Sequence, residues 1–410
     1  MSLRRKLLFA IVFASGLDAA TAVEVDPVRQ TALNQQLARI AVLRSERPRD
    51  GMLVFVEAMT LSQLGRRELA LSRLSELRDR GLGLLPTQGG GFDDLWADAE
   101  FQALRRQLAD EQVKTADAPV HLRLDDPRLI PEGIAYDAKR RRYFIGSIAQ
   151  KKIVSIDVSG QASDFSQPDD QLDQVLGLRV DGARDWLYAI STGVSDAEST
   201  GPRRNKVLRY RLSDGRLDQR FDVADAVQLN DVTTDADGNV YCTDSGSGTL
   251  YKMAVDATSF ERFGDVGGVR GANGLAVAAD GTLYVTLSLG IARLDPRTGA
   301  AERLPQPDDV VSGGIDGLYW KDGALLGIQN WTNPGRVIRL ELAADGKRIS
   351  ALRVLQSHHH GAFAEPTTGV IVGDKLMVIA NSHVAQYQAG NGFKNSETLR
   401  PTEVIAVPLR

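Results

Sequence analysis

The chain has 410 residues, of which 43% are hydrophobic and 25% charged, and its mean hydropathy is −0.20. This ordinary globular composition excludes collagen-like, disordered and multi-span membrane proteins. The single cysteine excludes an intramolecular disulfide and a multi-cysteine zinc site. A formal net charge of −4 argues against a nucleic-acid partner.

The first 22 residues have the layout of a secretory signal peptide. A basic start at residues 4–6 precedes an apolar run over 7–17 and the small residues of 20–22. The run is too short to cross a bilayer as a stable helix, and no later stretch is long enough. We therefore expect an exported protein, periplasmic or secreted, without a membrane span; a short anchor or a buried first helix is the alternative.

Residues 26–113 have the apolar spacing of helices. Leucines and isoleucines recur every three or four residues over 33–43, and two further helices are expected to end near Gly65 and Gly81. A last helix is expected over 92–108. The second and third helices resemble one tetratricopeptide-type pair. The favoured interpretation is a small bundle that packs on the main domain, and the alternative is a groove that binds a partner.

From about residue 118 to 410 the apolar spacing changes to alternation, which is typical of strands. Asp-Gly pairs separate the alternating segments, and such pairs favour tight hairpin turns. The five pairs begin at Asp214, Asp237, Asp280, Asp322 and Asp345. This region is therefore predicted to be all-β.

A repeat indicates how these strands are arranged. Six segments begin alike, and their aligned positions are 43 to 54 residues apart; the positions are Gly133, Gly177, Asp231, Gly274, Gly317 and Gly369. A period of this length accommodates four strands and is typical of a β-propeller blade. We predict a mainly β protein with a six-bladed propeller, preceded by the helical region. In the fourth blade, strands are expected at 274–278, 282–287, 291–295 and 301–304.

Polar residues recur just before the aligned position in four of the six segments. They are Glu132, Asn230, Asn273 and Asp316. Because the first strand of each blade lines the central channel, these two carboxylates and two amides should converge on one axis. An all-oxygen set suits Ca²⁺ and does not suit zinc or copper. The alternative is that these side chains only cap strand ends.

The segments 131–133, 229–231, 272–274 and 315–317 resemble those of the gluconolactonase/regucalcin (senescence marker protein) family. This family belongs to a wider group of calcium-dependent propeller hydrolases that includes paraoxonases and strictosidine-synthase-like proteins. The resemblance covers residues 118–410 and implies a divalent cation in the channel and hydrolysis of a lactone or related ester. It assigns Glu132, Asn273 and Asp316 to the metal and Asn230 to the metal or the substrate. Asp316 is also the candidate for the residue that activates water.

The chain departs from the family pattern at several positions. Ile134 and Ala135 follow the first Glu-Gly, where the family often has a proline and an aromatic residue. Gln228 stands where the gluconolactonase branch has an arginine that precedes the substrate-facing asparagine. No counterpart of the paraoxonase histidine pair is found. Gln228 and Glu365, which opens the last blade, are predicted to contact substrate.

Other residues were weighed as candidates. The run His358–His360 is expected to be a solvated loop rather than a metal site, and His383 a surface or packed residue rather than a base. Gln329, Asn330 and Trp331 fit either a substrate rim or an ordinary loop. Cys242 is expected to be a buried core thiol.

These observations give two hypotheses. The first is a calcium-dependent hydrolase of lactones or related esters, in which a metal-polarised carbonyl is attacked by water in the channel. The second is a propeller without catalytic activity, with a structural metal and a surface that binds a partner, helped by the helical region.

The signal-peptide prediction can be tested directly. Expression of the whole chain in a secretion-competent bacterial host should give an exported protein that begins at Val23, because the signal ends in Ala20-Thr21-Ala22. Intact-mass and N-terminal analysis of the purified protein measure this. A retained Met1 in the mature protein would contradict the prediction.

Overall fold

The computed structural model describes residues 27–193, 204–266, 271–331, 334–389 and 391–410. The predicted signal peptide lies outside these residues. The chain divides into two compact units, of which the first contains the helices. The second consists of Lys114–Gln306, Ser312–Trp331 and Gly335–Arg410. Among the described residues, no helix combines the length and apolar character that a membrane crossing requires.

From residue 27 on, where the structure describes it, the helical unit contains four α-helices and one 3₁₀ turn. They are α1 (Pro27–Glu46), α2 (Gly51–Gln63), α3 (Arg67–Ser75), η1 (Asp93–Leu95) and α4 (Ala99–Asp110). Gly65, with a φ of 68°, ends the segment after α2 as expected, because glycine adopts the left-handed conformation at little cost. α2 and α3 pack against each other across this turn.

Two helix boundaries differ from the prediction. The third helix ends at Ser75 and not at Gly81. The last helix begins at Ala99 and not at Phe92, because the side chain of Asp98 accepts hydrogen bonds from the amides of Glu100 and Phe101, both at 2.9 Å, and caps the helix there. The apolar residues that suggested an earlier start are buried nevertheless, in the 3₁₀ turn and beside it.

A charge network joins the first three helices. Glu57 of α2 accepts hydrogen bonds from Arg44 of α1 at 2.5 Å and from Arg73 of α3 at 2.8 Å. Arg44 and Arg73 also pair with Glu76, at 2.8 and 2.6 Å. Burial opposes the ionised form of Glu57, but the two arginines outweigh it and lower the pKa of this carboxyl.

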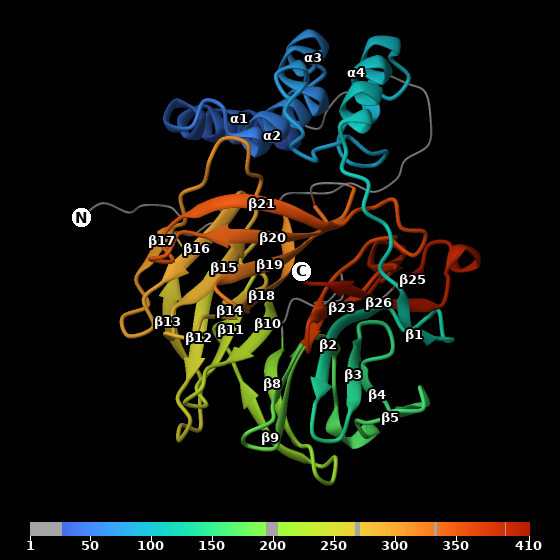
Figure 1. The fold of residues 1–410 in the computed structure, drawn as a ribbon, viewed down its shortest axis with the longest axis vertical. Coiled ribbons are helices and arrows are strands. Elements are labelled where there is room, and N and C mark those ends of the chain that lie inside the picture. Colours follow the sequence, from blue (N-terminus) through green and yellow to red (C-terminus); the bar gives the residue numbers. More distant parts are fainter. Residues whose placement is uncertain (1–26, 194–203, 267–270, 332–333, 390) are drawn as a thin grey trace. The chain divides into compact units, whose positions relative to one another are not determined.

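The second unit is a six-bladed β-propeller, as predicted. Each blade is a four-stranded antiparallel sheet (Figure 1). The first blade contains β2 (Pro131–Asp137), β3 (Arg142–Ser147), β4 (Lys152–Ile156) and β5 (Ala162–Asp164); the second β6 (Gln174–Asp181), β7 (Trp186–Thr192), β8 (Asn205–Arg211) and β9 (Leu217–Asp222); and the third β10 (Leu229–Thr234), β11 (Val240–Asp244), β12 (Thr249–Met253) and β13 (Glu261–Asp265).

The remaining blades follow the same order until the last. The fourth contains β14 (Leu275–Val277), β15 (Leu283–Leu287), β16 (Gly290–Leu294) and β17 (Ala301–Arg303), close to the predicted bounds; the fifth β18 (Ile315–Lys321), β19 (Ala324–Gln329), β20 (Arg336–Leu342) and β21 (Ile349–Gln356); and the sixth β22 (Gly369–Val372), β23 (Lys375–Ile379), β26 (Thr402–Pro408) and β1 (Val120–Leu124). The small hairpin of β24 (Tyr387–Gln388) and β25 (Gly392–Phe393), the turns η3 (Val384–Gln386) and η4 (Ser396–Thr398), and η2 (Pro168–Asp170) lie between strands.

The sixth blade closes the ring. β26 pairs with β23 on one side and with β1 on the other, so the strand order is β22-β23-β26-β1. The propeller is thereby closed by hydrogen bonds between the two ends of its own sequence, which protects strand edges that would otherwise stay unpaired.

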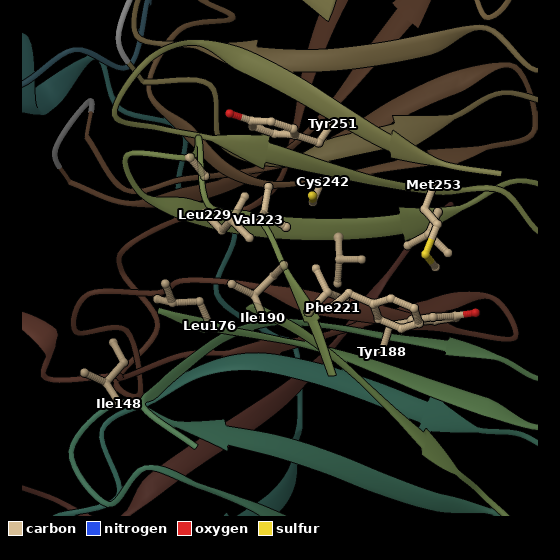
Figure 2. Packing of buried hydrophobic residues seen from close by; sticks show 14 of the residues in the cluster. Ile148, Leu176, Tyr188, Ile190, Phe221, Val223, Leu229, Cys242, Tyr251 and Met253 are labelled. Carbon is tan, nitrogen blue, oxygen red and sulfur yellow. The ribbon is translucent and has the colours of Figure 1, made fainter. Parts of the chain in front are cut away.

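The turns and the core follow from the sequence pattern. The glycines of all five Asp-Gly pairs have positive φ, between 66° and 93°. The alternating apolar residues pack between blades, and Figure 2 shows one such cluster, in which Leu176, Ile190, Leu229 and Cys242 belong to the second and third blades. The prediction for Cys242 is confirmed, since its thiol is buried in this cluster.

The charge network of the helical unit leads to a pH-dependent prediction. Glu57→Gln should lower the free energy of unfolding of α1–α3 by about 1–3 kcal/mol near neutral pH, since it removes one partner of a partly buried ion network. Because folding lowers the pKa of Glu57, its stabilisation is present above its ordinary pKa of 4.5 and is lost as the pH falls through the lower folded value. Hydrogen exchange of the α1–α3 amides should therefore show a difference from wild type that shrinks in acid.

Glu68→Gln is the matched control, because Glu68 is exposed and pairs only with Arg67. Equal effects of the two substitutions, or a Glu57→Gln effect that grows in acid, would contradict the assigned role of Glu57.

Candidate functional site

The innermost strands of the six blades surround a cavity of about 270 Å³. β2, β6, β10, β14, β18 and β22 all contribute to its lining, and each of these strands contacts the next around the ring. The cavity therefore lies in the central channel that the repeat predicts.

A β-bulge interrupts the inner strand at the aligned position in four blades. The register of β2 against β3 shifts between Pro131 and Ile134, and that of β18 against β19 between Ile315 and Leu318. β6 and β10 have the same irregularity. A bulge leaves residues out of the ladder and re-aims their side chains. Glu132 and Asp316 lie within these bulges, and each is only 6% exposed.

The backbone before Glu132 is strained. Ile130 has a φ of 47°, a left-handed conformation that is rare for a β-branched residue, and it is fully buried. The neighbouring blade holds the segment in place, because the hydroxyl groups of Thr367 and Thr368 donate to the carbonyl oxygen of Glu132. The strained backbone at Ile130 and these hydrogen bonds fix the position from which the Glu132 side chain enters the channel.

Glycine follows three of the four candidate ligands, Glu132, Asn273 and Asp316, because adjacent inner strands are in close contact there. A Cβ atom on Gly133 would collide with the carbonyl oxygen of Leu176, and one on Gly274 with the carbonyl oxygen of Asp316. At the second position the backbones are also bonded, since the Gly274 amide donates to the Asp316 carbonyl oxygen at 2.9 Å. The glycines of the repeat therefore determine how near the polar side chains can approach one another.

Three buried oxygen atoms of the channel have no hydrogen-bond partner in the described part of the chain. They are Oε2 of Glu132, Oδ1 of Asp316 and Oδ1 of Asn330. Asn330 directs its Nδ2 group to Oδ2 of Asp316 at 2.6 Å and to the carbonyl oxygen of Pro366 at 3.0 Å, and Asn273 also hydrogen-bonds the Asp316 side chain. Buried oxygens without donors are costly unless a cation or water binds them.

The carboxylates are also close enough to repel one another. Burial raises the pKa of Glu132 well above its ordinary value, and the charges of Asp316 and Asp231 raise it further. Burial likewise raises the pKa of Asp316, although hydrogen bonds from Asn330 and Asn273 partly offset this. Asp231 adds to the repulsion. A divalent cation at this place would relieve both effects.

The donor set fits a hard cation. The described residues contain no group of three or more histidine, cysteine, aspartate or glutamate side chains that could hold a metal ion. A cation at the channel end would therefore use two carboxylates, Glu132 and Asp316, completed by amide oxygens such as those of Asn273 and Asn330. Carboxylate and amide oxygens are the ligands of Ca²⁺ rather than of zinc.

The other predicted site residues lie around this group. Asn230 is in the bulge of β10 and is partly exposed. Gln228 precedes β10, and its amide donates to Asp244 at 2.8 Å. Glu365 is exposed, has a φ of 64°, and accepts the Ala385 amide at 3.0 Å, and its charge adds to the repulsion on Asp316. The roles of these three residues stay predictions.

The histidines make contacts elsewhere. His358 and His359 stack with ring centroids 4.0 Å apart, His359 contacts Ser357, and His360 contacts the carbonyl oxygen of Ala118 at 2.8 Å. The last contact lies beside the start of β1 and not at the channel. His383 accepts the Arg400 amide at 3.2 Å and is partly buried. It is a packed residue of the loop before η3.

Sequence reasoning noted Asn330 only as a possible rim residue and did not assign it to the cation. The missing information was its position: it follows β19 directly, and β19 pairs with the strand that holds Asp316. The available signal was a polar residue directly after the second strand of the fifth blade. This feature is not part of the repeat, so the repeat did not point to Asn330.

Comparison with known proteins gives structural matches only. No protein-family model matches the chain, and no curated protein matches it. Among solved structures, a putative oxidoreductase (glucose dehydrogenase) of Thermus thermophilus is 16% identical, covers 71% of this chain and 100% of its own, and has a TM-score of 0.50.

Gluconolactonase and regucalcin, which give the resembled family its name, are also among the similar solved structures. The gluconolactonase of Xanthomonas campestris is 15% identical over 72% of this chain and 98% of its own, with a TM-score of 0.46. The calcium-binding protein regucalcin of Agrobacterium tumefaciens is 18% identical over 73% and 98%, with a TM-score of 0.48. At these identities the likeness concerns the fold alone.

The close contact at Gly274 can be tested by adding a methyl group. Gly274→Ala should lower the free energy of unfolding of the propeller by about 3 kcal/mol, since its Cβ would meet the backbone of β18 and not a movable side chain. Denaturant titration followed by circular dichroism measures this. Gly182→Ala is the control, because no atom lies within 4 Å of its added Cβ. A tolerated Gly274→Ala would mean that the blades can separate at this point.

Proposed function

We propose that this protein is an exported hydrolase of lactones or related esters that depends on a divalent cation, Ca²⁺ before others. The observation that carries the proposal is the group of buried oxygens without donors on Glu132, Asp316 and Asn330. The resemblance of the blade openings to the gluconolactonase/regucalcin family supports it.

Glu132, Asp316, Asn273 and Asn230 would hold the cation, with the side-chain oxygen of Asn330 beside them. When bound, Ca²⁺ would polarise a substrate carbonyl and lower the pKa of a water molecule. The charge of the two carboxylates matches that of one divalent ion. The amides add neutral oxygens, which Ca²⁺ accepts in its shell of six to eight ligands.

The two side-chain oxygens of Asp316 differ in their hydrogen bonding, and this suits Asp316 to a role in the reaction. Oδ2 is fixed by Asn330 at 2.6 Å, so the orientation of the carboxylate is set. Oδ1 has no hydrogen bond in the described residues and is free to orient a water and accept its proton. Gln228, Asn230 and Glu365 lie near the ends of the inner strands and are proposed to contact the substrate.

Metal binding and hydrolysis are tested together. Calorimetric titration with Ca²⁺ should show one site per chain and a raised Tm, and a panel of lactones and aryl esters should be hydrolysed with Ca²⁺ and much more slowly with chelator. Glu132→Gln and Asp316→Asn should each weaken Ca²⁺ binding by about tenfold or more. The loss of a residue that only hydrogen-bonds a metal ligand already lowers metal affinity by about this factor.

Glu302→Gln is the control, since Glu302 is an exposed carboxylate of β17. Ca²⁺ binding without any hydrolysis would favour the binding module with a structural metal. Absence of Ca²⁺ binding, or hydrolysis that is indifferent to both chelator and Asp316→Asn, would overturn the proposal.

A further inference from the structure

Arg179 of β6 is a partly buried cation that the proposed reaction does not use. It lines the central cavity, and its Nε atom is buried without a hydrogen-bond partner. Within the described residues, its guanidinium makes neither a hydrogen bond nor an ion pair within 4 Å. Burial lowers the pKa of Arg179, but an arginine stays charged at neutral pH. A donor of a charged group that is buried without a partner is costly and is normally matched by a ligand or a counter-ion.

The nearest opposite charge in the cavity is already engaged. Asp231 of β10 attracts Arg179 electrostatically, but its two oxygens accept the backbone amides of Val232 at 2.8 Å and Leu275 at 3.3 Å. Asp181, the other carboxylate that acts on Arg179, pairs with Arg184 at 3.1 Å. The donors of the Arg179 guanidinium are therefore left for another acceptor.

The position of Arg179 in the repeat leaves space next to it. It stands two residues after the aligned glycine of its blade, and the equivalent residues of all six inner strands line the same cavity. These residues are Ala135, Arg179, Thr233, Ala276, Tyr319 and Ile371. Two alanines leave room in this ring.

Tyr319 adds a second donor to the ring. Its hydroxyl oxygen accepts the Gly369 amide at 2.6 Å, so the O–H group itself remains to donate. Arg179 and Tyr319 also interact electrostatically with each other. The two side chains thus present a guanidinium and a hydroxyl to one cavity.

The rest of the lining determines which anion fits. The lining mixes polar and apolar groups, and its apolar members include Ala135, Ala276 and Ile371 of the ring. A planar carboxylate matches the two parallel donors of a guanidinium, whereas the nearby charge of Asp231 disfavours a dianion such as phosphate. A small inorganic anion would leave these apolar positions uncovered.

We propose that Arg179 forms a second binding site in the channel, separate from the carboxylates, that takes an organic monocarboxylate with an apolar body. The guanidinium binds the carboxylate as a fork, Tyr319 donates to it, and the apolar members of the ring cover the body of the ligand.

Benzoate is a suitable probe, with benzamide as its neutral match. Calorimetry should show that benzoate binds once per chain and raises the Tm, and that benzamide binds at least tenfold more weakly. Arg179→Met should weaken benzoate binding at least tenfold, Arg179→Lys should weaken it less, and Arg216→Met, at an exposed arginine, should leave it unchanged. The same results are expected with Ca²⁺ and with chelator, so they are independent of the proposed hydrolase activity.

Equal binding of benzoate and benzamide would overturn the site, as would full binding by Arg179→Met. Chloride or phosphate binding as tightly as benzoate would overturn the assignment to an organic monocarboxylate. The comparison of benzoate with benzamide on the wild-type protein needs no variant and decides the question even if Arg179→Met does not fold.

Discussion

Six strands run side by side around one axis, and their close contact depends on the five glycines among the six aligned positions of the repeat. Gly133 and Gly274 lie where a single added carbon would meet the backbone of the next blade. The interdigitation of the apolar residues between blades, the width of the channel and the meeting of polar groups from different blades all follow from this spacing. A wider ring would leave Glu132 and Asp316 too far apart to share a cation.

The distribution of charge along the channel gives it two different ends. Carboxylates and amides gather where the inner strands begin, and an arginine stands two residues beyond the aligned glycine of its blade. The charge of Asp231 acts on both groups, because it repels Glu132 and Asp316 and attracts Arg179. One divalent cation together with Arg179 would balance Glu132, Asp316 and Asp231, so the channel can be neutral although it contains three acids.

Much of the architecture could be predicted because turns and repeats are local properties of a sequence. The Asp-Gly pairs indicated hairpins, and the shared openings indicated six blades and placed Glu132 and Asp316 at equivalent positions of one ring. Features that depend on contacts between distant segments could not be predicted in this way. The bulges that re-aim Glu132 and Asp316, the cap that delays α4 to Ala99, and the approach of Asn330 to Asp316 all need partners that no short pattern specifies.

The closure of the ring also sets an order in time. β26 lies between β1 and β23, yet it follows all the other described strands in the sequence. Five blades can form during synthesis, since domains generally begin to fold from their N-terminal parts. The sixth blade cannot be completed until β26 has been synthesised and pairs with β1 and β23. A chain that stops before residue 402 would therefore carry the side chains of the channel without a closed channel to hold them.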